Sequence, residues 1–106
     1  FVKDLKSNET FEDTLILTFS EFGRRVKQNA ATGTDHGAAN NVFVIGKNLK
    51  KAGFYNNLAS LSDLDDNGDL KFEIDFRTVY ATVLSQWLNA DDTTILNNSF
   101  DKLSFI

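Results

Sequence analysis

The chain has 106 residues, of which 42% are hydrophobic and 25% are charged, a composition typical of one small globular domain. Eleven basic and fifteen acidic residues give a net charge of −4 with no dense basic stripe, which makes nucleic acid and anionic membranes poor partners. The lack of cysteine excludes disulfides and thiolate chemistry, and no apolar run approaches the roughly 20 residues of a transmembrane segment.

The first residues of the chain have a helical pattern. Phe1, Val2 and Leu5 fall at helix-like spacing, and no N-cap residue stands before them. This pattern predicts the tail of a helix that starts earlier. We therefore expect residues 1–106 to be one C-terminal segment of a larger domain, without an internal linker or repeat.

Two apolar, β-branched runs predict the strands, namely Asp13–Phe19 ("DTLILTF") and Asn41–Gly46 ("NVFVIG"). Continuous apolar runs are typical of strands buried on both faces, as in parallel sheets covered by helices. We therefore expect Asp13–Phe19 and Val42–Ile45 to be neighbouring or near-neighbouring parallel strands of one sheet. The side chains expected to be buried are Leu15, Leu17, Val42 and Val44. The polar stretch between the runs, residues 20–40, predicts a long loop that is functional or mobile.

The second half of the chain combines a turn with a helix. Asn67-Gly68 is a strong two-residue hairpin signal between short extended pieces. Asp75 suits an N-cap, and apolar residues then recur at i, i+3 and i+4 spacing as far as Trp87. The tail that follows has short apolar pairs, which we expect to pack back onto the sheet. This order of elements indicates an α/β fold.

An acidic stretch in front of the helix resembles the opening of a calcium loop of the EF-hand type. The matching positions are Asp63, Asp65, Asn67, Gly68 and Leu70. The twelfth position, which should supply a bidentate glutamate, is Ile74. The pattern therefore favours a plain Asn-Gly hairpin that turns without calcium, and a calcium-stabilised structural module is the alternative.

The stretch "TFSEFGRR", Thr18–Arg25, combines a carboxylate with two arginines at the end of the first expected strand. Glu21 could bind a metal ion there. The guanidinium groups of Arg24 and Arg25 match the geometry of phosphate or sulfate oxygens. The alternative is a capped turn with two solvated arginines.

The only histidine of the chain stands in the triplet Asp35-His36-Gly37. Aspartate and neutral imidazole are common ligands of zinc and similar ions. Neighbouring residues rarely reach one ion, so we expect one ligand and one orienting partner, or one ligand for each of two metals. The alternative is an aspartate that caps a turn and a histidine that bonds to the backbone.

Three stretches together resemble one protein family: "DTLILTFSEFGRR", "GTDHGAANNVFVIG" and "DFRTVYATVLSQWL". They are similar to the C-terminal part of the sulfatase-like proteins grouped as domain of unknown function 1501, within the alkaline phosphatase superfamily. The resemblance implies a three-layer α/β/α sandwich around a mostly parallel sheet. It also implies a metal-assisted site for phosphate or sulfate esters, and export to the periplasm or the extracellular side.

The resemblance also implies roles for single residues. Glu21 matches an aspartate ligand of one metal, and Phe22 replaces a histidine that helps to hold the same ion. His36 matches a late histidine ligand of the other metal, with Asp35 beside it as a further ligand candidate. The nucleophile and the remaining ligands belong to the part of the family that comes before this segment, so no catalytic residue is expected here.

These expectations combine into one functional hypothesis. The chain would be the C-terminal part of a hydrolase of small anionic esters that uses a divalent metal such as zinc, completed by the remainder of the parent protein. Glu21 and His36 should then approach each other, with His36 partly exposed in a cleft, and Arg24 or Arg25 should clamp the oxyanion. The alternative is a binding protein that kept the fold and lost catalysis, which the change at Phe22 favours.

Overall fold

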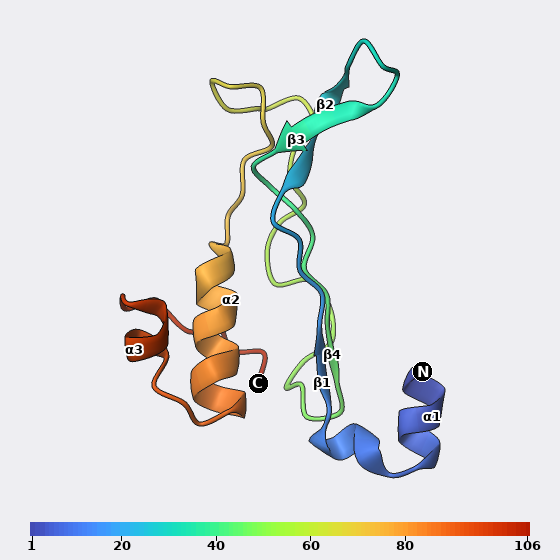
Figure 1. Cartoon of the computed structure of the whole chain (residues 1–106), viewed down its shortest axis with the longest axis vertical. Helices are drawn as coiled ribbons and strands as arrows, with labels where there is room; N and C mark the ends of the chain where they lie inside the picture. The colour runs from blue at the N-terminus through green and yellow to red at the C-terminus, as the bar shows by residue number, and fades with distance from the viewer.

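A long antiparallel ribbon forms the centre of the structure, a computed structural model that describes residues 1–106 (Figure 1). Its strands are β1 (Leu15–Leu17), β2 (Gly23–Gln28), β3 (Thr34–Gly37) and β4 (Val44–Gly46). β1 pairs with β4 and β2 pairs with β3, both antiparallel. The chain therefore runs up one side of the ribbon, turns after β2, and returns along the other side.

The expected parallel sheet is wrong, and with it the three-layer α/β/α sandwich. β1 and β4 lie antiparallel, with Leu15 opposite Gly46 and Leu17 opposite Val44. Parallel neighbours need a crossover connection, usually a helix. Here the connecting residues 20–40, which we expected to be a loop, form β2 and β3 and lengthen the hairpin instead. An apolar run predicts a strand but does not reveal the direction of its partner.

The burial expected for these strands is also wrong. Leu15, Leu17 and Val44 are half-buried, and 41% of Val42 is exposed. A ribbon of two strands has no further strand or helix layer to cover both of its faces, so its side chains keep contact with solvent. The whole molecule measures 48 × 35 × 22 Å, and only 7 of its 106 residues are buried.

The helices lie at two places along the ribbon (Figure 1). They are α1 (Val2–Ser7), the 3₁₀ turn η1 (Thr10–Asp13), α2 (Phe76–Thr82), the π-helical turn η2 (Val83–Trp87) and α3 (Asp92–Leu96). α1 and η1 lie at the end of the ribbon formed by β1 and β4, while α2 and α3 lie together on one side. None of these helices has the length and apolar content needed to cross a lipid bilayer.

The predicted helices and the predicted hairpin are confirmed, but the turn of the hairpin differs from the two-residue Asn67-Gly68 turn that we expected. Leu64 and Leu70 form an isolated antiparallel bridge. The Gly68 N–H donates to the carbonyl of Asp65, so Asp66 and Asn67 occupy the centre of the turn and Gly68 follows them with a φ of +80°. The helix begins after Asp75 and continues through η2 to Trp87. The expected helix at the start of the chain is present as α1. Each of these elements is specified by residues close together in sequence.

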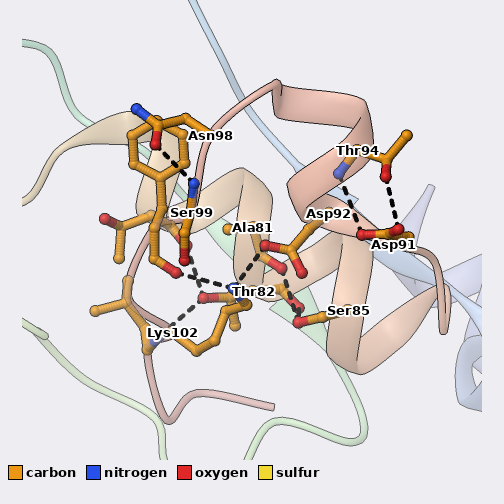
Figure 2. A network of polar contacts seen from close by, with 12 residues as sticks. Ala81, Thr82, Ser85, Asp91, Asp92, Thr94, Asn98, Ser99 and Lys102 are labelled. Atoms are coloured by element: carbon orange, nitrogen blue, oxygen red, sulfur yellow. Dashed lines mark hydrogen bonds and ion pairs between the residues drawn. The ribbon is translucent and has the colours of Figure 1, made fainter.

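The small core lies beneath α2 and is tied together by polar groups (Figure 2). Thr82 is fully buried, and its hydroxyl donates to the carbonyl of Thr78 at 2.7 Å while accepting the Leu103 N–H at 2.8 Å. The Lys102 ammonium binds the buried carboxylate of Asp92 at 2.6 Å. These contacts attach the C-terminal tail to α2 and α3.

The tail also reaches the segment that follows the ribbon, as the sequence led us to expect in part. The N–H of Lys50 donates to the carbonyl of Phe105 at 3.0 Å, and the rings of Phe105 and Tyr55 meet edge to face at 5.9 Å. The tail thus bridges the helical part and the rest of the chain.

At the start of α3, the hydroxyl and the N–H of Thr94 hold the pKa of Asp91 below its ordinary value.

Replacing Asp75 by alanine should destabilise α2 by about 1 kcal/mol at neutral pH. The Asp75 carboxylate accepts the Arg77 N–H at 2.9 Å and also the Arg77 guanidinium, and these contacts hold its pKa below the ordinary value of 3.8. Because the folded pKa is depressed, this stabilisation is present above pH 3.8 and is lost as the pH falls through the lowered pKa.

The measurement is urea unfolding followed by Trp87 fluorescence, for the wild-type chain and for Asp75→Ala at several pH values. The Asp101→Ala variant is the control, because the exposed Asp101 carboxylate makes no hydrogen bond or ion pair. A difference between wild type and Asp75→Ala that stays constant well below pH 3.8 would contradict the assigned capping role.

Candidate functional site

The pairing of β2 with β3 brings two of the predicted site residues together. Arg24 lies directly opposite His36, and Gly23 lies opposite Gly37. Opposed residues of a strand pair share one face, and successive side chains of a strand point to opposite faces. Arg24 and His36 therefore occupy one face of the ribbon, which we call the Arg24–His36 face.

An aromatic stack holds the imidazole on this face. The rings of Phe22 and His36 are stacked with centroids 3.6 Å apart and planes 12° apart. The guanidinium carbon of Arg24 lies 5.1 Å from the centroid of Phe22, and Arg24 Nη1 donates to the carbonyl of Thr34 at 2.7 Å. His36 does not bond to the backbone, so both of its ring nitrogens remain available to a ligand.

The other two predicted residues of the hairpin are already engaged with protein groups. Arg25 Nε and Nη2 bind the two carboxylate oxygens of Asp69 at 3.1 and 3.5 Å. Asp35 Oδ1 accepts a hydrogen bond from Asn29 Nδ2 at 2.9 Å. Asp35 follows the alternation of the strand away from His36, so the two neighbouring side chains do not converge on one point.

Glu21 lies in the bend before β2, where it is exposed and makes no hydrogen bond or ion pair. No three carboxylate or imidazole side chains are grouped so that they could hold a metal ion. Glu21 and His36 are therefore at most two of the four ligands that a closed zinc site needs. Phe22, which follows Glu21 directly, stacks on His36.

The carboxylates of the acidic loop, residues 63–69, bond to other groups of the protein. Asp65 Oδ1 accepts the N–H groups of Asn67 and Asp69 at 2.9 and 2.8 Å. Asp63 binds Lys71 at 2.6 Å, and Asp69 binds Arg25. These bonds make a turn that is supported by its own side chains.

Most of the candidate side chains are exposed, and only Arg25 is half-buried. Two of the hollows of the molecule lie elsewhere. One, of about 680 Å³, is lined by Lys6, Glu9, Phe11, Glu12 and Lys47. The other, of about 280 Å³, is lined only by apolar residues: Leu17, Tyr80, Val83, Leu84, Ile95 and Leu96. The cleft that we expected around His36 is not among them.

Sequence reasoning missed two contacts that shape the site. The Phe22 ring was interpreted only as a lost ligand, although an aromatic residue two positions before Arg24 could have indicated a stacking partner on the same face of a strand. The bond between Arg25 and Asp69 joins residues 44 positions apart, and no local signal predicts it.

The sequence profile of one family matches residues 1–98 of the chain. The family is described as "Protein of unknown function (DUF1501)". Neither the curated proteins nor the solved structures give a significant match. A match over almost the whole chain shows that this protein belongs to the DUF1501 family.

Proposed function

We propose that the Arg24–His36 face binds the phosphate or sulfate group of a small ester. The observation that supports this proposal is the antiparallel pairing that sets Arg24 opposite His36 on an exposed face. A guanidinium group presents several N–H donors in a fixed fork, and an imidazole adds an N–H donor beside it. Donors of this kind match the oxygens of a phosphate or sulfate group.

The positions of both donors are set before any ligand binds. The hydrogen bond from Arg24 to Thr34 restrains the guanidinium, and the stack with Phe22 restrains the imidazole. Side chains that are already ordered lose less conformational entropy when a ligand binds. The remaining N–H groups of Arg24 and the ring nitrogens of His36 have no protein partner. The face thus presents restrained donors that no other protein group occupies.

Metal-dependent hydrolysis of such esters is a second candidate function. It is favoured by Glu21 and His36, which both carry ligand atoms without a protein partner. Glu21 precedes Phe22 in the sequence, and His36 stacks on the Phe22 ring. The resemblance of their motifs to those of sulfatase-like proteins supports the same reaction. This chain would supply only part of the coordination shell, because zinc at a catalytic site takes three protein ligands and a water. It would supply no nucleophile.

Changing His36 to glutamine should weaken binding of inorganic phosphate about tenfold to a hundredfold, because charge-assisted hydrogen bonds contribute roughly 1.5–3 kcal/mol each. Arg24→Gln should have a similar effect. Binding is measured by titration with phosphate or sulfate, followed through the amide resonances of β2 and β3. The control is Lys27→Gln, which removes an exposed cation of β2 that forms no ion pair.

Equal losses for Lys27→Gln and His36→Gln would mean that phosphate responds only to the general charge of the hairpin, and the proposed site would be rejected. The same His36→Gln variant tests the second candidate when zinc replaces phosphate as the titrant. Weak zinc binding should be lost in His36→Gln and in Glu21→Gln. Zinc that perturbs neither residue in the wild-type chain contradicts a role as ligands.

A further inference from the structure

The two adjacent arginines of the hairpin have different environments. Arg24 is exposed and shares one face with His36. The Arg25 side chain is only 37% exposed and holds both carboxylate oxygens of Asp69, a residue that is 8% exposed. From sequence the two arginines are equivalent candidates for an anion, and the structure separates them.

Asp69 is held firmly in its loop. Its N–H donates to the carboxylate of Asp65 at 2.8 Å, and its carbonyl accepts the N–H of Asp65 at 2.9 Å. The bridge between Leu64 and Leu70 closes the hairpin around it. This loop lies beside the β2–β3 end of the ribbon (Figure 1). The Asp69 carboxylate is thus presented to β2 by a turn that its own hydrogen bonds have fixed.

We propose that Asp69 is a positioning residue. Its ion pair with Arg25 holds strand β2 in place, and Arg24 remains free to contact the anion. This inference rests on the proposed anion-binding function. The Arg25–Asp69 pair holds β2 directly after Arg24, at the start of the stretch where its register with β3 shifts. By fixing Arg25 there, the pair keeps Arg24 opposite His36.

The inference predicts an effect opposite to that of charge alone. Asp69→Asn makes the chain less negative, and long-range electrostatics alone would then strengthen phosphate binding. If Asp69 acts by positioning β2, the same change should weaken phosphate binding about threefold to tenfold, because residues coupled through one salt-bridge network affect each other on that order. Asp69→Glu, which keeps a carboxylate for Arg25, should recover most of the affinity.

The experiment titrates inorganic phosphate into the full chain and its variants while following the ring resonances of His36. The expected spectroscopic signature of Asp69→Asn, before any phosphate is added, is a changed ring-current shift of His36 from the stack with Phe22. Asp63→Asn is the matched control, because Asp63 pairs with Lys71 at an exposed position of the same loop. Unchanged amide resonances in α2 show that each variant remains folded.

Three outcomes are decisive. Weaker binding with a shifted His36 resonance in Asp69→Asn, and neither effect in Asp63→Asn, supports the inference. Unchanged or tighter binding in Asp69→Asn overturns it, and tighter binding combined with a large loss in Arg25→Gln would assign the anion to Arg25. A wild-type chain that does not bind phosphate overturns the proposed function, and the inference with it.

Discussion

Replacing Gly23 by alanine is expected to unpair the β2–β3 end of the ribbon. Gly23 is buried, and a Cβ atom there would lie 1.5 Å from the carbonyl oxygen of Ala39 and 2.4 Å from its carbonyl carbon. Both are backbone atoms, so no side-chain rotation relieves the overlap and one of the two segments must move. Overpacking of this kind costs on the order of 3 kcal/mol.

The measurement is amide hydrogen exchange of β2 and β3, which reports the free energy of opening for each residue. Exchange should accelerate in Gly23→Ala, and the alignment of Arg24 opposite His36 should be lost with the pairing. Phosphate binding should fall at the same time, because the Arg24–His36 face depends on that pairing.

Gly33→Ala is the matched control in the turn of the same hairpin. A Cβ at Gly33 would meet only the Asn29 side-chain oxygen, at 3.8 Å, which is an ordinary van der Waals contact. The expected change is within about 0.5 kcal/mol, as for most surface substitutions. Similar exchange rates in the two alanine variants would contradict the close approach of Gly23 and Ala39.

Replacing Thr82 by valine is expected to cost about 1–3 kcal/mol, because it leaves a partly buried backbone N–H without its acceptor. Valine keeps the shape of threonine but lacks the hydroxyl that accepts the Leu103 N–H at 2.8 Å. The hydroxyl also donates to the carbonyl of Thr78 within α2. Its loss should release the C-terminal tail from α2, since this bond is one of the few that join them.

Urea unfolding followed by Trp87 fluorescence measures the effect, because Trp87 ends the helix that carries Thr82. Thr93→Val is the control, since Thr93 is an exposed threonine of α3 whose hydroxyl makes no hydrogen bond. The control should change the free energy of unfolding by less than about 0.5 kcal/mol. A loss no greater in Thr82→Val than in Thr93→Val would show that the buried hydroxyl contributes nothing to holding the tail.

The features predicted correctly from sequence depend on short-range chemistry. Asp75 accepts the Arg77 N–H two residues on, and Gly68 completes the hairpin turn by the conformational freedom of glycine at a φ of +80°. The spacing of Phe1, Val2 and Leu5 predicted α1 for the same reason. In each case the residues that determine the structure lie within one turn of the chain.

The features predicted wrongly depend on partners that are distant in sequence. The apolar runs of β1 and β4 fit a parallel and an antiparallel neighbour equally well, and the pairing decides between them only in three dimensions. β2 was interpreted as loop because it has polar residues on both faces, which a ribbon exposed on both sides tolerates. The pattern therefore lacked the alternation by which a half-buried strand is identified.

The candidate site shows the same contrast between features set by nearby residues and features set by distant ones. Arg24 and His36 were identified from their chemistry, but that they face each other follows from the register of β2 and β3. Arg25 and Asp35 have the same chemistry and are engaged by Asp69 and Asn29. Residue type thus indicated which groups can bind an anion, and only tertiary structure separates the free groups from the engaged ones.

The different roles of Arg24 and Arg25 depend on the irregular stretch of β2 that begins after Arg24. Arg24 pairs with His36 and Gln28 pairs with Thr34, but the register shifts between these two pairs. The turn of residues 29–33 sets the second pair through the Asn29 side chain, which accepts the N–H groups of Ala31 and Gly33. An insertion or deletion in this turn would therefore leave Arg24 opposite His36 only if the irregular stretch absorbed the change.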